Sequence, residues 1–343
     1  MVVTIASPLE AELVERIRAV AAVGEVLYDP ALLPQPRYPN DHRGDDLVRD
    51  AAGERRWTAM LARANVLFGY SQESGEGLLR ALELAPSVRF VQGTSAGMGA
   101  HIRRANLTPE TLARVRFASA AGVHAQMLAE FAFYGLLALR KDAARLARLR
   151  AARSWTHYTM GELEGSTLAI VGMGQIGKAV AQLARAFAMR VVVVARQTEY
   201  QPLADRTYRP EQLRDAFGEA DAVVLTLPAT DLTEGLVDAE VLATLKPSAV
   251  FVNVGRGSVV DQDALVAMLA DGRLAGAVLD VFINEPLPAE HPLWTMENVV
   301  LSPHTAALSV HENRRIVDLF CDNLARLGAG LPLRNALNVQ EFY

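Results

Sequence analysis

The sequence contains a single cysteine, Cys321. One thiol excludes an internal disulfide, and without a nearby group of His, Asp or Glu residues we expect no structural metal site. Sparse cysteine is typical of proteins of the reducing cytoplasm, where we expect this chain to act.

Long hydrophobic runs are absent as well. The longest apolar stretch covers residues 131–139, far short of the roughly 20 residues that a membrane-spanning helix needs. The opening residues, MVVTIASPLE, lack the basic segment of a secretory signal and soon turn polar. We therefore expect no membrane partner.

Charge of one sign is not in large excess. The 343 residues carry a formal net charge of −5, which gives no reason to expect nucleic acid as a partner. A hydrophobic content of 51% with 21% charged residues is typical of a globular protein. The chain is long enough for two domains with separate cores.

A glycine-rich turn stands between an apolar strand and an amphipathic helix in the stretch from Ser166 to Arg196. Gly172, Gly174 and Gly177 form the pattern GxGxxG, which allows a sharp turn, a close approach to a pyrophosphate, and packing of the helix on its strand. Gln175 and Ile176 open the helix, whose N–H groups attract phosphate. The pattern predicts a dinucleotide site formed by these five residues.

The residues after the next strand indicate which dinucleotide binds. An NAD site places an acidic residue there to bind the ribose 2′-hydroxyl, but the sequence has Arg196 and Gln197. A guanidinium can instead pair with a 2′-phosphate. We therefore favour NADP(H), with NAD(H) possible if Arg196 is a solvent-facing residue and Glu199 takes the acidic role.

Strands and helices alternate along the whole chain, which predicts an α/β fold of two doubly wound parallel-sheet domains. The irregular loop 29–46 contains four prolines and is long enough to be functional or mobile. One long helix is expected over residues 123–150 and a last helix over residues 308–327. Expected strands cover residues 2–6, 25–27, 66–68, 88–91, 115–119, 168–171, 191–194, 222–227, 250–254, 277–282 and 299–301.

Ligands bind such sheets outside the carboxyl ends of the strands, and this rule selects further candidates. Those expected at the cofactor are Leu227, Pro228, Val254, Gly255 and Asp280. Three more residue types suit hydride transfer to a 2-keto acid. Arg256 offers a planar fork for a carboxylate, His304 can exchange a proton near neutral pH, and Glu285 can hold the other ring nitrogen. His291 competes as proton donor, but its loop position favours packing.

Several ordered motifs resemble the D-isomer-specific 2-hydroxyacid dehydrogenases: TSAGM at Thr94–Met98, GVHAQMLAEF, VGMGQIG, VNVGRGSVVD, LDVFINEPLP, HPLW and SPHTA. The resemblance implies catalytic roles for Arg256, Glu285 and His304, and a position near the nicotinamide for Asp280. It also implies a flavodoxin-like substrate domain, residues 1–119 and 307–343, into which a Rossmann dinucleotide-binding domain, residues 120–306, is inserted. Homodimers are common in the family.

The same resemblance implies a substrate loop in the first domain. Phe68-Gly69-Tyr70-Ser71 matches best, so Gly69 and Tyr70 are expected to bind substrate with Arg256 and His304. Tyr70, Met98 and Trp294 could shape the pocket, although each could equally be a packing residue.

Arg196 is similar to the residue of NADPH-using glyoxylate and hydroxypyruvate reductases, so we expect a 2-keto acid or D-2-hydroxy acid as substrate and reduction as the direction. Two alternatives stay open: an NAD-linked dehydrogenase of another small acid, and a dinucleotide-sensing binding protein that is not an enzyme.

Overall fold

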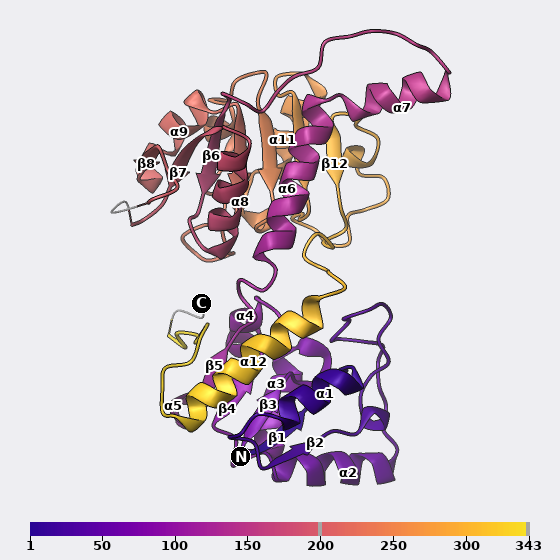
Figure 1. Ribbon diagram of the computed structural model, residues 1–343, viewed down its shortest axis with the longest axis vertical. Coiled ribbons are helices and arrows are strands. Elements are labelled where there is room, and N and C mark those ends of the chain that lie inside the picture. The colour runs from indigo at the N-terminus through magenta and orange to yellow at the C-terminus, as the bar shows by residue number, and fades with distance from the viewer. Residues whose placement is uncertain (198–200, 341–343) are drawn as a thin grey trace. The chain divides into compact units, whose positions relative to one another are not determined.

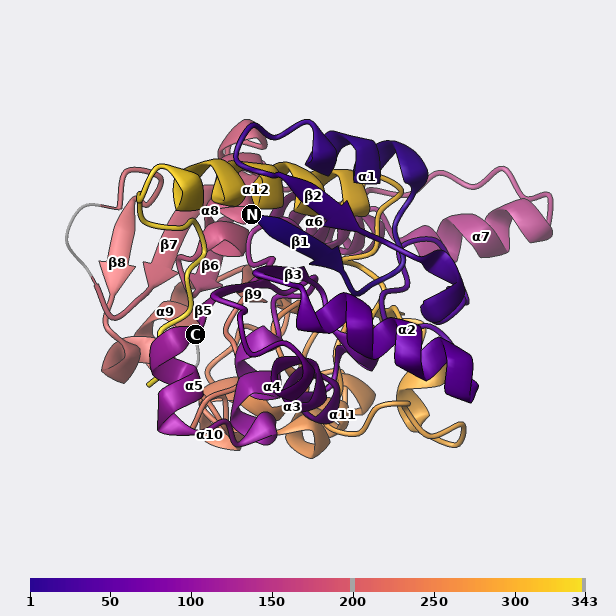
Figure 2. The same cartoon turned by 90° about the horizontal axis from the view of Figure 1, so that it is seen from below.

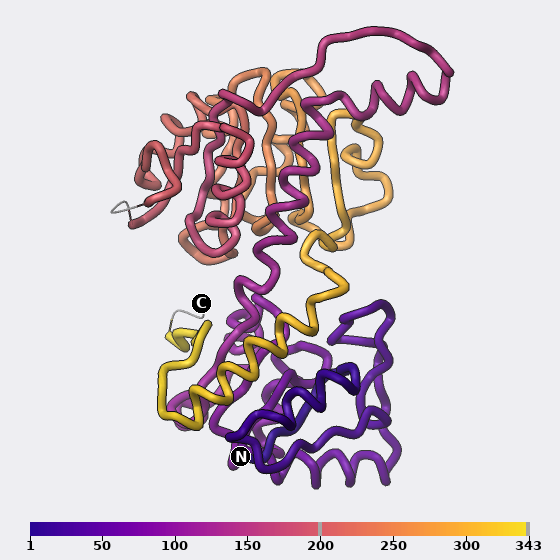
Figure 3. The backbone as a smooth tube through the Cα atoms, in the orientation of Figure 1, coloured from indigo at the N-terminus to yellow at the C-terminus, as the bar shows by residue number. Residues whose placement is uncertain are grey.

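The computed structural model describes residues 1–197 and 201–340. It divides into two compact units. The terminal unit combines Met1–His124 with the residues from Leu308 onward, and the inserted unit is Ala125–Ala307. Figure 3 shows that the chain starts and ends in the same unit, since its indigo and yellow segments lie together there. The domain boundaries expected from the sequence follow residues 119 and 306, whereas the boundaries between the two compact units follow residues 124 and 307.

The described part of the terminal unit contains a parallel five-stranded sheet with the order β2-β1-β3-β4-β5 (Figure 1). This is the flavodoxin-like order. Its strands are β1 (Val2–Ile5), β2 (Glu25–Leu27), β3 (Val66–Phe68), β4 (Phe90–Gln92) and β5 (Arg116–Ala118). Its helices are α1 (Ala11–Arg18), α2 (Ala51–Ala62), α3 (Gly75–Leu84), α4 (Met98–Ala105), α5 (Pro109–Arg114) and α12 (Glu312–Gly328).

Helices cover both faces of this sheet, as the view in Figure 2 shows, with α1 and α12 on one side and α2, α3 and α4 on the other. Successive residues of a strand point to opposite faces. Phe68 therefore packs beneath α12, where its ring lies 5.1 Å from that of Phe320, while Leu67 belongs to the core on the other face. Both faces are apolar because both are covered.

The inserted unit has a parallel sheet whose described strands follow the order β12-β11-β10-β9-β6-β7-β8. Renumbered within the unit, this is the Rossmann order, in which the strand sequence reverses between β6 and β9. Its strands are β6 (Thr167–Val171), β7 (Arg190–Val194), β8 (Arg206–Tyr208), β9 (Ala222–Leu225), β10 (Val250–Asn253), β11 (Gly276–Leu279) and β12 (Val299–Leu301). The two sheets confirm the predicted fold class.

The helices of the inserted unit are α6 (Ala125–Arg140), α7 (Ala143–Ala151), α8 (Gln175–Ala186), α9 (Leu213–Glu219), α10 (Ala239–Leu242) and α11 (Gln262–Ala270). Helices α6 and α8 cover one face of the sheet, and α9 and α11 cover the other. Short 3-10 turns lie at Pro30–Leu32, Ser71–Glu73, Pro210–Gln212, Gly257–Val259 and Pro292–Trp294.

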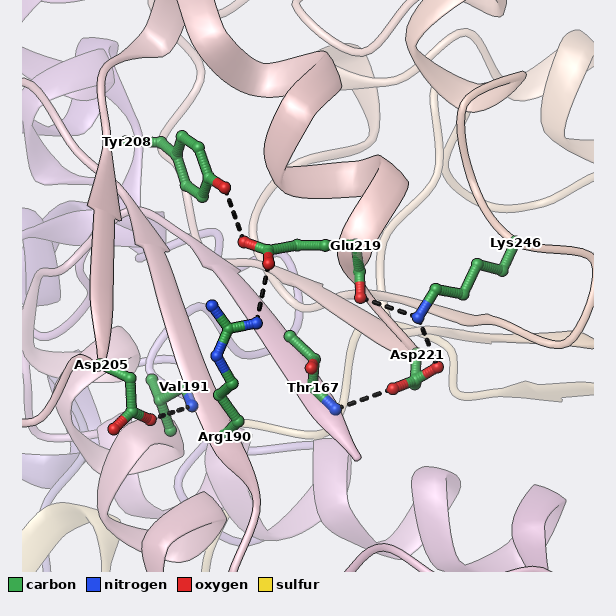
Figure 4. Close-up of polar contacts among 8 residues, drawn as sticks. All are labelled: Thr167, Arg190, Val191, Asp205, Tyr208, Glu219, Asp221 and Lys246. Atoms are coloured by element: carbon green, nitrogen blue, oxygen red, sulfur yellow. Dashed lines mark hydrogen bonds and ion pairs between the residues drawn. The ribbon is translucent and has the colours of Figure 1, made fainter. Parts of the chain in front are cut away.

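A network of charged side chains joins the amino ends of β6, β7 and β9 (Figure 4). Lys246 donates to Asp221 at 2.8 Å, and Asp221 also accepts from the backbone N–H of Thr167 at 2.9 Å. Glu219 accepts from Arg190 and from the hydroxyl of Tyr208, both at 2.7 Å. Apart from Tyr208, the last residue of β8, these residues lie at or next to the amino ends of the strands, away from the glycine turn.

Two helix predictions were wrong in their bounds. The helix expected over residues 308–327 begins later, at Glu312. The helix expected over 123–150 is two helices, since Asp142 adopts φ +53° and its carboxylate accepts from the N–H of Arg145 at the start of α7. An apolar and then basic sequence gives no signal for this break.

Candidate active site

The cofactor residues predicted from sequence lie at the carboxyl ends of β6, β7, β9, β10 and β11 in the inserted unit. Parallel strands place these ends at one edge of the sheet, and β6 and β9 flank the point where the strand order reverses. Ligands of doubly wound sheets bind at such a point. The topology therefore brings the glycine turn, Leu227 and Gly255 to one edge.

The geometry of the glycine turn matches a pyrophosphate site. Gly172 has φ +98°, which L-residues with a side chain rarely adopt. A Cβ on Gly177 would lie 2.1 Å from the carbonyl oxygen of Gly172, so only glycine lets α8 start this close to β6. By contrast, a Cβ on Gly174 would meet no described atom within 4 Å. The space beside Gly174 is open at the start of α8, where backbone N–H groups point outward.

The neighbouring predicted residues build the wall beside this turn. Leu227 follows β9, and its Cδ2 atom would lie 2.9 Å from a Cβ on Gly172. A Cβ on Gly255 would lie 2.6 Å from the carbonyl oxygen of Leu227, so the loops after β9 and β10 pack tightly. Val254 is buried, Ile176 is half-buried, and Gln175 and Pro228 are exposed.

Arg196 and Gln197 follow β7 and are both exposed. The end of β7 lies next to the glycine turn, because β6 and β7 pair along Thr167–Val171 and Arg190–Val194. A ribose attached to a pyrophosphate at the turn reaches this position. Glu199, the alternative acidic residue, lies outside the described residues.

His304 and Glu285 form a close pair. The ring Nδ1 of His304 lies 2.7 Å from Oε2 of Glu285, while Oε1 of Glu285 accepts from the backbone N–H of Phe282 at 2.9 Å. The His304 side chain is 45% exposed, so its ring is accessible. With Nδ1 engaged by the carboxylate, Nε2 is the ring atom left to exchange a proton with a ligand.

Asp280 fixes the loop that carries His304. Its Oδ1 accepts from the hydroxyl of Ser302 and from the backbone N–H of Ala306, the latter at 3.0 Å, and its carbonyl oxygen accepts from the N–H of His304 at 3.0 Å. Asp280 is 1% exposed. These bonds hold His304 in a left-handed conformation with φ +56°, which is costly for a residue with a side chain. Sequence reasoning did not find this positioning role.

Arg256 lies half-buried at the end of β10. Burial lowers the pKa of its guanidinium below the ordinary value, and the negative charges of Glu285 and Asp280 offset only part of this effect. A Cβ on Gly257 would lie 2.1 Å from the carbonyl carbon of Phe282, so the loop of Arg256 is locked against the loop of Glu285. The structure therefore brings the cation, the carboxylate and the imidazole to neighbouring strand ends.

His291 caps the short turn Pro292–Trp294. Its Nδ1 accepts from the N–H of Leu293 at 3.3 Å, and its Nε2 lies 3.2 Å from the side-chain amide of Gln262. Trp294 is 46% exposed and donates through its indole N–H to the carbonyl of Pro288 at 2.9 Å.

The predicted substrate loop follows β3 in the terminal unit. Gly69 has φ +70°, and its N–H donates to the carbonyl of Gln92 at 2.8 Å. The Tyr70 side chain is 1% exposed and its hydroxyl lies 2.7 Å from Nδ1 of His101; burial raises the pKa of this phenol. Met98 is fully buried. The side chains of Tyr70 and Met98 are thus core residues.

A pair that sequence reasoning missed supports the same loop. The Ser7 hydroxyl, after β1, lies 2.9 Å from Nδ1 of His42 in the long proline-containing loop. Ser7 in turn packs against the predicted substrate loop, since a Cβ added to Gly69 would lie 2.6 Å from the Cβ of Ser7. Nε2 of His42 is buried and has no hydrogen-bond partner in the described structure. Two residues that are 35 positions apart, one of them in an irregular loop, leave no sequence signal for such a pair.

Within residues 1–197 and 201–340 we find no group of three or more His, Cys, Asp or Glu side chains placed to hold a metal ion. In the same residues no helix combines the length and apolarity needed to cross a membrane.

Comparison with known proteins identifies the family. Residues 133–306 match the model of the NAD binding domain of D-isomer specific 2-hydroxyacid dehydrogenases. The chain is 32% identical over 268 residues to a glyoxylate reductase of Aeropyrum pernix, covering 75% of this chain and 78% of that protein. It is 33% identical over 291 residues to glyoxylate/hydroxypyruvate reductase B of Yersinia pseudotuberculosis, covering 82% and 86%.

A solved structure agrees along almost the whole length. The D-isomer specific 2-hydroxyacid dehydrogenase family protein of Aeromonas salmonicida superposes with a TM-score of 0.79 at 25% identity, covering 98% of this chain and 99% of that one. The family match and the sequence identities point to the same kind of protein as the two sheet orders and the residues at the sheet edge. The chain belongs to the D-isomer specific 2-hydroxyacid dehydrogenases, which are NAD(P)-dependent oxidoreductases.

Proposed function

We propose that this enzyme reduces a small 2-keto acid of the glyoxylate or hydroxypyruvate type to the D-2-hydroxy acid, with NADPH as the preferred cofactor. The observation that carries the proposal is the 2.7 Å contact between His304 Nδ1 and Glu285 Oε2 beside the half-buried Arg256. Related glyoxylate and hydroxypyruvate reductases support the substrate class.

Arg256 binds the substrate carboxylate in this proposal. A half-buried guanidinium is poorly screened by water, so its attraction for a carboxylate is stronger than that of an exposed one. The backbone of the loop after β3 supplies further donors. Because the N–H of Gly69 is engaged by Gln92, we assign this role to the amides of Tyr70 and Ser71.

His304 gives the proton. Glu285 holds Nδ1 and so fixes the ring orientation, and it stabilises the positive charge of the protonated imidazole. Nε2 then donates to the carbonyl oxygen as that oxygen gains negative charge. Asp280 keeps the backbone of His304 in place through the bond to its N–H.

The glycine turn and the loops after β7, β9 and β10 would hold the dinucleotide, which supplies the hydride when bound. The open space at Gly174 and the start of α8 fit its pyrophosphate. Arg196 supports the NADPH preference, because its guanidinium can pair with a 2′-phosphate and no acidic residue occupies positions 195–197.

Two chains pair in this proposal through the region of α6, α7 and the segment that follows. Tyr134, Leu146 and Trp155 are 62%, 42% and 92% exposed there. Large exposed apolar side chains in one region favour a protein contact. Light scattering coupled to size-exclusion chromatography of the wild type and of Leu146→Glu/Trp155→Glu tests the pairing.

The test of the activity follows NADPH and NADH consumption separately with glyoxylate, hydroxypyruvate, pyruvate and phenylpyruvate. We expect turnover of the first two with NADPH. A clear preference for NADH would overturn the assignment of Arg196 but not the hydride transfer. No turnover of any 2-keto acid with either cofactor would overturn the proposed reaction. Arg256→Gln should lower kcat/KM by about 100-fold or more, because it removes a charged partner of the substrate.

A further inference from the structure

A cavity of about 950 Å³ lies at the amino ends of the terminal unit's strands. Its lining includes Asn65 before β3, Arg89 before β4, Arg116 at the start of β5 and Arg114 at the end of α5. Figure 1 shows the N-terminus, α5 and the carboxyl end of α12 at this same end of the unit. The predicted substrate loop lies at the opposite, carboxyl end of β3, roughly 13 Å away at about 3.3 Å per residue.

The lining carries charge of one sign. It contains three arginines and no acidic residue, although the whole chain has a net charge of −5. Within the described residues, neither Arg89 nor Arg116 has a hydrogen bond or ion pair through its guanidinium, and both side chains are exposed at the cavity. Like charges gathered in a concave surface attract an anion.

The third arginine is held in place. Nη1 of Arg114 donates to the carbonyl oxygens of Pro86 and Val88, each at 2.7 Å, which anchors the loop between α3 and β4. Its Nη2 and Nε atoms are not engaged by any described residue. The backbone beside it is also fixed, because Arg116 N–H donates to the carbonyl of Arg89 and Arg89 N–H to that of Asn65, both at 2.9 Å. Arg89 and Arg116 are therefore carried by backbone that the sheet holds in place.

We propose that this cavity binds a small organic phosphate. Planar guanidinium groups match the oxygens of a phosphoryl group in a bidentate manner. These arginines lie beside apolar side chains that suit the short carbon skeleton of such a ligand, namely Val66, Pro86, Ala113 and Leu327. The cavity volume falls within the range of small-molecule sites. This site is distinct from the edge that carries the proposed reaction and does not depend on it.

The test is a calorimetric titration of glycerol 3-phosphate into the wild-type protein in excess NADP⁺ at low ionic strength. The probe lacks the carboxylate that Arg256 would bind, and the dinucleotide occupies the phosphate site at the glycine turn. We expect one site per chain, binding that weakens as salt rises, and no heat with glycerol. Absence of heat with glycerol 3-phosphate in the wild type would overturn the proposal.

Two sets of variants locate the binding. Arg89→Gln/Arg116→Gln should weaken binding at least tenfold, while Arg209→Gln/Arg314→Gln, which removes two charges from exposed positions outside the cavity, should leave it within twofold. Ala113→Glu adds a carboxylate to the lining and should abolish binding. All of these positions are exposed, so folding should persist and is checked by thermal unfolding. Equal affinity in the cavity variants and the control pair would show that the anion binds elsewhere.

Discussion

Nε2 of His124 lies 2.7 Å from Oε1 of Glu312, a residue 188 positions further along the chain. His124 is the last residue of the terminal unit before the chain enters the inserted unit, and Glu312 opens α12 just after the chain returns. Their side chains are only 11% and 6% exposed. The hydrogen bond thus closes the terminal unit at the two points where the chain crosses its boundary.

Removing the histidine should destabilise the terminal unit. In His124→Ala the buried carboxylate of Glu312 loses its partner, which typically costs about 3–5 kcal/mol. Urea unfolding monitored by circular dichroism measures the loss. Glu312→Gln, which keeps a hydrogen-bond acceptor without the charge, is the matched control and should lose less. Equal stability of His124→Ala and the wild type would show that the pair contributes nothing.

The proton-donor role predicts a selective loss of turnover. His304→Ala should lower kcat by roughly 10²–10⁴-fold with a small change in KM, because general acid catalysis contributes about this much. Glu285→Gln keeps a side chain that can bind Nδ1 but removes the charge, so its kcat should fall less. His291→Ala serves as the control, because His291 caps a turn and competes for the role of proton donor in the sequence. Normal turnover in His304→Ala would contradict the assignment.

The two glycines of the turn should respond differently to the same added methyl group. Gly174→Ala meets open space, so the protein should keep its stability while its Kd for NADP(H) rises about tenfold or more. Gly177→Ala places Cβ 2.1 Å from a backbone oxygen and should lower the stability itself. Fluorescence titration and thermal unfolding of both variants separate the effects. Unchanged cofactor affinity in Gly174→Ala would argue against a pyrophosphate at this turn.

Arg196 should set the cofactor preference. Arg196→Asp should raise the KM for NADPH by roughly 10–100-fold, the range expected for losing a hydrogen bond to a charged group, and should spare NADH. Arg209→Asp, an exposed residue after β8, provides the control for the change in charge. Steady-state kinetics with each cofactor give the answer, and parallel losses for NADPH and NADH would mean that Arg196 does not read the 2′-phosphate.

The charged network in Figure 4 predicts a dependence of stability on pH. Burial would raise the pKa of Asp221, but Lys246 and the Thr167 N–H outweigh it, and the pKa lies below the ordinary value of 3.8. The stabilisation is therefore complete above pH 3.8 and is lost as pH falls through the lowered pKa. Asp221→Asn should cost about 1 kcal/mol at pH 7 and less as the pH falls below 3.8. The exposed Asp231→Asn is the control, and a cost that does not change with pH would contradict the linkage.

Short apolar runs in the sequence predicted the strands well, because the signal for a strand lies within the strand itself. The strands Val66–Phe68 and Val299–Leu301 were predicted at their observed bounds, because short apolar runs between helical segments leave little choice. Helices α4 and α5 were missed, since each is short and follows a strand without a long periodic face. The break at Asp142 was missed because a left-handed residue that also caps a helix depends on its three-dimensional setting.

The site residues divide in the same way into those that local patterns predict and those that depend on the folded structure. The expectation that Arg256, Glu285 and His304 lie at the strand ends of one sheet needed only strand order, and the structure brings Glu285 and His304 into contact. The bonds of Asp280 to the His304 loop and the Ser7–His42 pair depend on side-chain directions, which no strand pattern encodes. The roles of Arg256, Glu285 and His304 in binding and catalysis stay predictions, which the experiments above test.

The insertion also sets the order in which the protein can be completed during synthesis. Phe68 and Phe90 leave the ribosome early, but Phe320, which covers them from α12, leaves only after the whole inserted unit. At typical translation rates of about 5–20 residues per second, the interval is roughly 10–40 s. The inserted unit can fold within that time, while the part of the sheet face that α12 covers stays exposed until α12 emerges.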